Sequence, residues 1–470
     1  MIGIMTGGKI MDYRGKKIAV IGAGKSGIAA AALLEHEGAL PFVYDEGENF
    51  DADAAGERLR KALVPYGIKE SVTVFTGGLP SDEEISSFEI AVFSPGVPLD
   101  TPFAEKLKAK GVKISGEIEL AYTCAKGRLI AITGTNGKTT TTALTGKICA
   151  DHFGKSFVVG NIGDPYTDAA AFTKDGDVTV AEISSFQLES TDLFHPQVCA
   201  ILNITPDHLN RHHTMENYIA CKERITKRQS AEDVCVLNYD DPYTKEFGSR
   251  CKSSVIFFSG TEKLKDGYFL DGDMICRAYN GEVKSLMNVK EMKLKGKHNA
   301  ENVMAAMAMT ESIGVPMEEV IATVREFNAV EHRIEFVRDH KGVEYFNDSK
   351  GTNPDAAIKA VEAMDRPTVV IGGGYDKQST YDEWIESFDG HVKALVLIGA
   401  TADKIEECAR SHGFDAVYRA ESLKEAVKIS ASLSKEGDAV LLSPACASWD
   451  MFKNYEERGR QFKEYVRGLE

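Results

Sequence analysis

An octapeptide at residues 134–141, GTNGKTTT, has the composition of a phosphate-binding loop. It follows the apolar run LIAIT and opens a segment with helical character. Glycine lets backbone N–H groups wrap around phosphate oxygens, and the start of a helix adds partial positive charge. We expect Lys138 to reach the β and γ phosphates of a nucleotide and a threonine hydroxyl to hold Mg²⁺. The loop departs from the general G-x4-G-K-[ST] pattern, because Ile132 occupies the position of the first glycine.

A second glycine motif, GAGKSG at residues 22–27, follows another apolar run. Gly22 suits a tight turn, Gly24 allows close approach of a diphosphate, and Gly27 allows a helix to pack on the strand. Asp45 ends the next apolar run, where a carboxylate can reach ribose hydroxyls. The motif is compatible with NAD and with any other ligand that carries ribose and diphosphate. The chain thus has two phosphate motifs, whereas a dehydrogenase needs only one.

Further acidic and basic side chains follow the phosphate loop. Glu182 ends the run VTVAE, where its carboxylate can approach a Mg²⁺ ion at the loop. His208 and His212 have the i, i+4 spacing of a zinc pair, but Leu209 stands where the HExxH motif has glutamate, so this pair does not predict zinc. Lys222 lies on the helix predicted next and by itself indicates only a solvated charge.

Short β-branched runs ending in glycine alternate with alanine-rich and leucine-rich helical segments along the chain. This rhythm is typical of parallel βαβ units and restarts twice, which predicts an α/β protein of three domains. We expect a Rossmann-like domain at 1–116, a central ATPase-like domain with a phosphate loop at 117–329, and a second Rossmann-like domain at 330–470. Between residues 230 and 297, shorter runs predict antiparallel hairpins, which add a small antiparallel sheet to the parallel sheet of the central domain.

Composition supports a folded protein and excludes several classes. The chain has 470 residues, 43% of them hydrophobic, which is enough for several cores. The formal charge is −16 and no basic run is present, so we expect neither nucleic acid nor membrane as a partner. The N-terminal segment lacks the apolar stretch of a signal peptide. Nine scattered cysteines without a CxxC pair indicate reduced thiols and a cytoplasmic protein.

Eight motifs occur in one order along the chain: GTNGKTTT, GNIG at 160–163, AEISSFQLE at 181–189, LNITPDHLNRH at 202–212, KGKHNAENVMAA at 295–306, EHRIEFV at 331–337, NDSKGTNPDA at 347–356 and LLSPACASWDMFKNYEERG at 441–459. Together they resemble the ATP-dependent Mur ligases of bacterial cell-wall synthesis. The resemblance runs from about Lys16 to the C-terminus. The last block and NDSKGTN are most similar to the branch of the family that adds D-glutamate.

The resemblance implies an ATP-dependent ligase that joins D-glutamate to UDP-N-acetylmuramoyl-L-alanine through an acyl phosphate. It implies ATP, two Mg²⁺ sites and a CO₂-derived carbamate on Lys222 as cofactors, and we expect a monomer. Carbamylation would turn a cation that repels Mg²⁺ into a carboxylate-like ligand, and it requires a neutral amine. The implied catalytic residues are Lys138, Glu182, His208 and Lys222, and the implied metal ligands are Thr139, Glu182, His208 and Lys222.

Binding residues carry over from the resemblance in three groups. The expected ATP site contains Gly134, Thr135, Asn136, Gly137, Lys138, Thr139, Thr140, Asn299, Asn302, Arg333 and Asp348. The expected UDP-substrate site contains Gly24, Lys25, Ser26, Asp45, Ser94, Pro95, Gly96, Asn161, Ser184 and His208. The expected D-glutamate site contains Lys350, Thr352, Lys377, Ser448, Trp449 and Tyr455. Trp449 stands where the family often has leucine, and Tyr455 where it often has phenylalanine.

Three alternatives remain open from the sequence. A nicotinamide-dependent dehydrogenase would use GAGKSG but leaves the second loop and Glu182 unexplained. A nucleotide-binding switch without catalysis would need no pocket for a second, anionic amino acid. Within the ligases, a sister enzyme that adds a diamino acid or a dipeptide, or a folylpolyglutamate synthetase, would keep the chemistry and change the acceptor.

Overall fold

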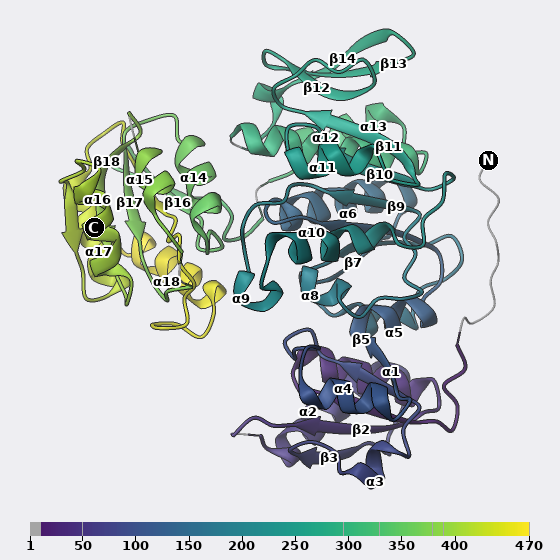
Figure 1. Cartoon of the computed structure of the whole chain (residues 1–470). Helices are drawn as coiled ribbons and strands as arrows, with labels where there is room; N and C mark the ends of the chain where they lie inside the picture. Colours follow the sequence, from purple (N-terminus) through teal and green to yellow (C-terminus); the bar gives the residue numbers. More distant parts are fainter. Residues whose placement is uncertain are drawn as a thin grey trace. The chain divides into compact units, whose positions relative to one another are not determined.

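The computed structural model describes residues 11–48, 50–294, 296–328, 330–377, 379–388 and 390–469. The chain folds as two compact units. The first contains residues up to 269 together with 276–284 and 304–323, and the second contains 270–275, 285–303 and 324–470. Three β-sheets form the framework of the fold (Figure 1).

The N-terminal sheet has five parallel strands in the order β3-β2-β1-β4-β5. Its strands are β1 (Lys17–Ile21), β2 (Leu40–Asp45), β3 (Val74–Gly77), β4 (Ile90–Phe93) and β5 (Lys113–Gly116). The helices of this block are α1 (Lys25–His36), α2 (Ala52–Leu63), α3 (Asp82–Ile85), α4 (Pro102–Ala109) and α5 (Glu117–Cys124), with a 3-10 helix η1 (Val64–Tyr66).

Alternation along β1 explains why helices cover both faces of this sheet. Ile18 and Val20 pack with residues of α1 and α2 in one core, and Ala19 and Ile21 pack with residues of α3 and α4 in another. Successive side chains of a strand point to opposite faces, so an uninterrupted apolar run requires cover on both sides. This is the doubly wound arrangement that the sequence rhythm predicts.

The central sheet has nine strands in the order β14-β13-β12-β11-β10-β9-β6-β8-β7. They are β6 (Arg128–Thr133), β7 (Phe157–Gly160), β8 (Val178–Glu182), β9 (Val198–Ile201), β10 (Val234–Asn238), β11 (Ser254–Ser259), β12 (Gly267–Asp271), β13 (Met274–Tyr279) and β14 (Glu282–Asn288). The helices are α6 (Lys138–Phe153), α7 (Tyr166–Ala170), α8 (Ser185–Leu188), α9 (Leu209–His212), α10 (Met215–Glu223), α11 (Pro242–Gly248), α12 (Lys297–Ser312) and α13 (Met317–Glu326), with 3-10 helices η2 (Arg224–Thr226) and η3 (Val289–Glu291). Strands β6 to β11 pair in parallel.

The predicted hairpins extend this sheet and do not form a sheet of their own. Strand β12 pairs in parallel with β11, with Phe258 opposite Tyr268 (Figure 1). Two-residue turns join β12 to β13 and β13 to β14. In the second turn Asn280 has φ 52° and Gly281 has φ 82°, the left-handed pair that a type I′ hairpin requires.

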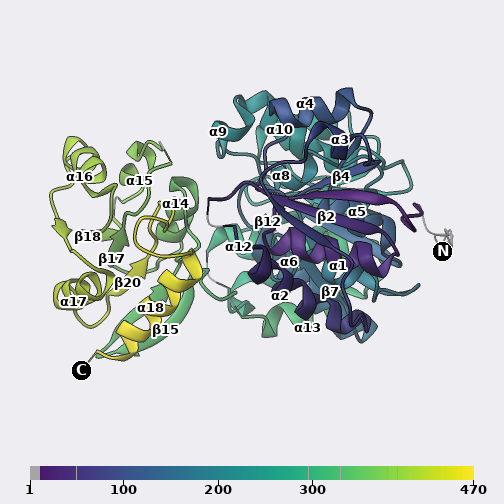
Figure 2. The same cartoon turned by 90° about the horizontal axis from the view of Figure 1, so that it is seen from below.

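The C-terminal sheet has six strands in the order β15-β16-β20-β17-β18-β19. They are β15 (Glu335–His340), β16 (Val343–Asn347), β17 (Thr368–Gly372), β18 (Val392–Leu397), β19 (Val417–Arg419) and β20 (Ala439–Leu442). The helices are α14 (Pro354–Glu362), α15 (Asp382–Glu386), α16 (Ala402–Ser411), α17 (Leu423–Leu433) and α18 (Tyr455–Arg467). Figure 2 shows α14, α15 and α16 on one face of this sheet and α17 and α18 on the other. Edge strand β15 is antiparallel to β16, a departure from a purely parallel Rossmann-like sheet.

The structure agrees with the predicted α/β class and its three blocks. Gly116, the predicted end of the first domain, is the last residue of β5 and the N-cap of α5. Ala329, the predicted end of the second, lies outside the described residues, as do residues 1–10. Both boundaries stay predictions. One hydrophobic core runs from α1 through α5 to Leu237 on β10, so the first two blocks share buried apolar residues.

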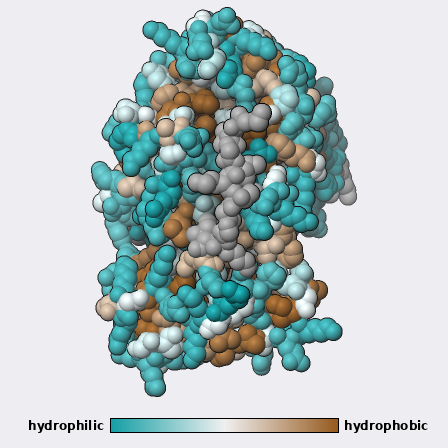
Figure 3. Space-filling model, turned by 90° about the vertical axis from the view of Figure 1, so that its right-hand side faces the viewer, coloured by the Kyte–Doolittle hydropathy of each residue, from teal (hydrophilic) through white to brown (hydrophobic). Residues whose placement is uncertain are grey.

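One face of the molecule is drawn in Figure 3. Hydrophilic side chains cover most of the face drawn in Figure 3, with smaller hydrophobic patches between them. Within the described part of the chain, no helix has the length and apolar character needed to cross a bilayer. All nine cysteines lie in that part and are free thiols.

Gly27 offers a test of the N-terminal packing. A Cβ atom added at Gly27 would lie 1.8 Å from the carbonyl oxygen of Gly22, so the backbone of the glycine loop would have to move. We expect Gly27→Ala to lower the free energy of unfolding of the first unit by about 1–3 kcal/mol, measured by urea denaturation. Gly56→Ala is the matched control, because Gly56 lies inside α2 with no atom within 4 Å of its added Cβ; it should stabilise by about 0.5–1 kcal/mol. Equal effects of the two substitutions would contradict the packing argument.

Candidate functional site

The phosphate loop forms the connection between β6 and α6. Gly134 has φ 149° and Gly137, the N-cap of α6, has φ 81°. A Cβ atom at Gly134 would lie 3.1 Å from Leu202 Cβ, so this position has neither the backbone angle nor the space for a side chain. The loop therefore depends on glycine at the two positions where the chain turns.

The segment after β9 fixes the shape of the loop. The Thr135 amide donates to the Asn203 carbonyl at 2.9 Å, and the Asn136 amide donates to Asn203 Oδ1 at 2.8 Å. The Thr135 hydroxyl lies 3.0 Å from the Tyr218 hydroxyl and accepts from the Thr205 amide at 3.0 Å. These bonds hold the loop rigid between β6 and α6, as pre-organised phosphate binding requires.

Two lysines donate to the same carbonyl oxygen of the loop. Lys138 Nζ lies 2.9 Å and Lys222 Nζ 2.7 Å from the Gly134 oxygen, and Lys138 also donates to the Thr135 oxygen at 2.7 Å. Two positive charges that share one acceptor oxygen repel each other, and the repulsion is strong away from bulk water. Burial lowers the pKa of Lys222 well below its usual range, and the charge of Lys138 lowers it further. The site therefore favours a neutral amine at Lys222.

Glu182 lies at the carboxyl end of β8, in one row with its neighbours on the sheet. Gly160 of β7 and Ile132 of β6 are its register partners. The Asn161 side chain donates to Glu182 Oε1 at 2.8 Å, and the Asn161 amide donates to the Glu182 carbonyl at 2.8 Å. Gly160 has φ 103°, and a Cβ atom there would lie 2.3 Å from the Glu182 carbonyl oxygen. The glycine thus permits the close approach that brings Asn161 to the carboxylate.

His208 begins α9 in the left-handed conformation, with φ 53°. Its amide donates to Asp207 Oδ1 at 2.9 Å, its Nε2 lies 3.5 Å from Asp207 Oδ2, and its ring contacts the edge of Phe186. Ser184 is the N-cap of α8 and accepts from the Gln187 amide at 3.2 Å. The first unit therefore contains Thr139, Glu182, His208 and Lys222, the four residues predicted as metal ligands.

The chemistry of these four side chains suits a hard cation only in part. Hydroxyl and carboxylate oxygens suit Mg²⁺, whereas an unmodified ammonium does not. Burial lowers the pKa of Lys222 toward the neutral amine that reaction with CO₂ requires, so these residues fit a magnesium site completed by a lysine carbamate.

The N-terminal glycine loop is shaped by Asp45. Its carboxylate accepts from the Ala23 amide at 2.7 Å and from the Gly47 amide at 2.8 Å. Asp45 therefore supports the loop itself, in addition to the predicted contact with ribose. Ser94, in the turn that continues through Pro95 and Gly96, donates to the Gly22 carbonyl at 3.1 Å.

Lys25 links the glycine loop to the turn after β7. Its Nζ donates to the Gly163 carbonyl at 2.8 Å and lies 3.0 Å from Asp164 Oδ1. Gly24, Lys25 and Ser26 stand at the start of α1, where N–H groups and helix dipole favour an anion. Asn161 belongs to the same turn as Gly163, so the structure brings this part of the predicted UDP-substrate site together within the first unit.

The second unit holds the other predicted residues. Asn302 donates to Asn299 across one turn of α12, at 3.1 Å. Asp348 is buried and accepts from the Ser443 hydroxyl at 2.9 Å and from the Ile334 amide at 3.3 Å. Burial raises the pKa of Asp348 to about 6, against the lowering effect of Arg333.

The predicted amino-acid site gathers at loops of the C-terminal sheet. Lys350 Nζ lies 5.4 Å from the centre of the Tyr455 ring, and Lys377 Nζ lies 5.9 Å from that of Trp449. Thr352 follows Lys350 in the loop after β16, and Ser448 is buried before Trp449 in the loop after β20. Trp449 is 63% exposed.

Arg458 is a residue that the sequence analysis missed. It is fully buried in α18, where Nε donates to the Ser349 hydroxyl at 3.0 Å and the two terminal nitrogens donate to the Cys446 carbonyl at 3.2 Å each. It thereby joins the two loops that carry Lys350 and Ser448. The segment YEERGR looks like a charged helix face, and no feature of the sequence marks this arginine as buried.

Comparisons with known proteins match this architecture. Three family models cover most of the chain: Mur ligase MurD-like N-terminal domain at 16–116, Mur ligase middle domain at 132–310, and Mur ligase glutamate ligase domain at 332–446. The chain belongs to the Mur ligase family. This confirms the resemblance drawn from the motifs and the three-domain α/β fold.

Two relatives that match over nearly the whole chain have the same name. The UDP-N-acetylmuramoylalanine–D-glutamate ligase of Lachnospira eligens is 50% identical over 461 residues, which is 98% of this Mur ligase and all of the relative. The protein of the same name from Clostridioides difficile is 46% identical over 461 residues, with the same coverage.

Two solved structures share this fold at low sequence identity. A UDP-N-acetylmuramate–alanine ligase from Thermotoga maritima has a TM-score of 0.60 at 20% identity and covers 96% of this chain and 99% of its own. A pseudomurein peptide ligase from Methanothermus fervidus has a TM-score of 0.58 at 18% identity, covering 97% and 100%. These two likenesses support the fold.

The raised pKa of Asp348 predicts a pH-dependent stability. Between its ordinary value of 3.8 and about 6, the folded protein binds more protons at this carboxyl than the unfolded chain does, so stability falls as pH rises through that window. Asp348→Asn removes the cost of the buried charge. We expect this variant to exceed wild type at pH 8 by up to about 3 kcal/mol in denaturant unfolding, and the difference to vanish near pH 4.

Asp438 is the matched control for this measurement. Burial opposes its ionisation, but bonds from Lys393 Nζ and the Lys435 amide hold its pKa below the ordinary value. Asp438→Asn should therefore be less stable than wild type at pH 8. A constant difference between Asp348→Asn and wild type across this pH range would show that burial does not disfavour the Asp348 charge.

Proposed function

We propose that this Mur ligase adds D-glutamate to UDP-N-acetylmuramoyl-L-alanine and converts ATP to ADP and phosphate in the synthesis of peptidoglycan precursors. The observation that carries the proposal is its 50% identity, over 98% of the chain, to a relative named for this reaction. The rigid phosphate loop with Lys138 supports the use of ATP, and the cationic side chains Lys350 and Lys377 suit a dicarboxylic amino acid.

The reaction needs ATP because a carboxylate cannot expel oxide. Transfer of the γ-phosphoryl group to the carboxylate of the L-alanyl substrate gives an acyl phosphate and ADP. The amine of D-glutamate attacks the acyl carbon, loses a proton, and the tetrahedral intermediate collapses to an amide and inorganic phosphate. Catalysis then consists mainly of positioning and charge neutralisation.

In this proposal the chain's own residues hold the phosphates and orient the carboxylate. The loop amides of residues 134–140 and Lys138 would bind the β and γ phosphates. In the structure Lys138 donates to two carbonyl oxygens of its own loop, and phosphate oxygens would take the place of these acceptors. Thr139, Glu182, His208 and carbamylated Lys222 would hold Mg²⁺, which neutralises charge on the transferred group. Asn161 and Ser184 would contact the muramoyl substrate.

The remaining predicted residues complete the proposal. Asn299 and Asn302 would face adenine, Arg333 the phosphates, and Asp348 the ribose. The D-glutamate carboxylates would bind Lys350, Thr352, Lys377, Ser448 and Tyr455, with Trp449 beside Lys377. The N-terminal loop would bind the uridine diphosphate through Gly24, Lys25, Ser26, Asp45 and the turn Ser94 to Gly96. We also infer that the protein is a monomer and that it is cytoplasmic. The nine free thiols support the cytoplasmic location.

Phosphate release tests the proposed reaction. With ATP, Mg²⁺ and UDP-N-acetylmuramoyl-L-alanine, we expect release that depends on D-glutamate and is absent with L-glutamate, L-lysine, meso-diaminopimelate or no amino acid. Release with one of the others would assign the chain to a sister ligase. If none supports release while the nucleotide still binds, the chain is a binding protein and the proposed reaction is wrong.

Substitutions at the two lysines separate their roles. Lys222→Ala should lose activity and regain part of it with added short carboxylic acids, because a small carboxylate can occupy the place of the carbamate. Lys138→Ala should lower turnover by about 10²-fold or more, since one preorganised charge is missing in the transition state, and no carboxylic acid should restore it. Equal rescue of both variants, or of neither, would contradict carbamylation at Lys222.

A further inference from the structure

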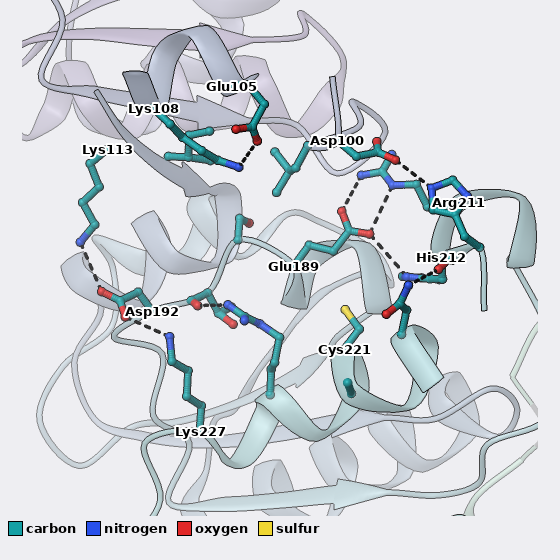
Figure 4. Close-up of a pocket in the computed structure, with 18 residues that line it drawn as sticks. Asp100, Glu105, Lys108, Lys113, Glu189, Asp192, Arg211, His212, Cys221 and Lys227 are labelled. Carbon is teal, nitrogen blue, oxygen red and sulfur yellow. Dashed lines mark hydrogen bonds and ion pairs between the residues drawn. The ribbon is translucent and has the colours of Figure 1, made fainter. Parts of the chain in front are cut away.

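A second group of ligand-type side chains lies beside the helices of the central block. Glu189 follows α8, His212 ends α9 and Cys221 lies on α10. One donor atom from each (a carboxylate oxygen, a ring nitrogen and the sulfur) lies within 4.8 Å of the other two. Figure 4 shows the three side chains pointing toward one another. This cluster uses none of the residues assigned above to ATP, Mg²⁺ or substrate.

Ser185 orients two of the three side chains. His212 Nε2 lies 2.9 Å from the Ser185 hydroxyl, and Cys221 Sγ lies 3.0 Å from the Ser185 carbonyl. When Nε2 donates to the hydroxyl, Nδ1 carries the lone pair, and Nδ1 lies 3.7 Å from Glu189 Oε1. Fixing one ring nitrogen by a hydrogen bond while the other faces the ligand set is the usual outer support of a histidine that binds a metal.

The cluster is buried yet borders a cavity. His212 and Cys221 are 5% and 7% exposed, and all three residues line a cavity of about 770 Å³. Arg211 donates to both oxygens of Glu189, at 2.7 and 3.3 Å. Oε2 accepts the shorter bond, whereas Oε1 accepts the longer one from Arg211 Nε and lies 3.7 Å from His212 Nδ1. An ion could enter from the cavity while Arg211 keeps its bond to Oε2.

We propose that Glu189, His212 and Cys221 form a binding site for a divalent transition metal of the Zn²⁺ class, separate from the magnesium centre. A thiolate, an imidazole and a carboxylate are a ligand set that zinc accepts, whereas Mg²⁺ prefers oxygen and does not favour a thiolate. In tetrahedral zinc sites the donor atoms lie roughly 3.5 Å apart, so small side-chain shifts would close the site. Binding displaces the thiol proton to solvent, and water from the cavity fills the fourth position.

The two other clusters with ligand-type residues in the described part of the chain are weaker candidates. Glu331 and Glu335, which flank His332, both bind Lys463. Asp382 and His412 flank Cys408 in the third cluster, and two of its three members are exposed. Because Cys408 offers the competing thiol, it provides the matched control.

Cobalt is the probe, because a Co²⁺–thiolate bond absorbs in the near ultraviolet and the proposed magnesium ligands include no thiol. The full chain is titrated with Co²⁺ in excess Mg²⁺. We expect a thiolate-to-cobalt band that saturates at one equivalent and disappears when Zn²⁺ is added. Cys221→Ser should abolish the band, Cys408→Ser should keep it, and His212→Gln should weaken Co²⁺ affinity about 10–100-fold.

The outcomes decide the proposal without use of ligase activity. Absence of the band in the wild-type chain overturns it, as does persistence of the band in Cys221→Ser or its loss in Cys408→Ser. If Cys221→Ser does not fold, as judged by circular dichroism, His212→Gln carries the test: unchanged Co²⁺ affinity in that variant overturns the site. Zn²⁺ should raise the unfolding temperature of the wild-type chain. Absence of this rise in whichever of Cys221→Ser and His212→Gln folds supports the site.

Discussion

The shared hydrogen bonds at the Gly134 carbonyl are the constraint on which the site depends. Two lysines, from the phosphate loop and from α10, donate to one oxygen. Their mutual repulsion and the burial of Lys222 favour a neutral amine there, which is the form that reacts with CO₂. The segment after β9 crowds the same glycine, because an added Cβ at Gly134 would lie 3.1 Å from Leu202 Cβ, and Asn203 fixes the loop through hydrogen bonds to Thr135 and Asn136. The Gly134 carbonyl therefore brings the phosphate-loop lysine and the lysine of the proposed carbamate to one point.

Parallel strand register supplies the second element of the site. Ile132, Gly160 and Glu182 lie in one row across three strands, so the carboxylate, the phosphate loop and Asn161 all emerge at the carboxyl edge of one sheet. In the second unit, Arg458 performs the corresponding task for the loops after β16 and β20, since its guanidinium bonds to both. Each unit thus uses the sheet to place its loops and a few buried polar groups to fix them.

Helices α8, α9 and α10 carry two sets of ligand-type groups of different hardness. His208 and Lys222 belong to the proposed magnesium centre, and the neighbouring His212 and Cys221 belong to the proposed transition-metal site. A mainly oxygen ligand set with a carbamate favours a hard ion, and a thiol with an imidazole favours a softer one. The type of ligand, more than the distance between the two sites, would determine which ion binds at each site.

The sequence by itself determined the α/β class, the three blocks, the phosphate loop and the family, because strand and helix periodicity and contiguous motifs are local properties of the chain. It also indicated antiparallel hairpins, although only the structure placed them as a continuation of the central sheet through β12 beside β11. Only the tertiary structure decided that Lys222 is buried beside Lys138, that Arg458 is an internal arginine, and that Glu189, His212 and Cys221 converge. The spacing of the cysteines gave no sign of the proposed transition-metal site, because its three residues include one cysteine and come from three separate segments. Burial and convergence of residues distant in sequence arise from packing, which no local pattern records.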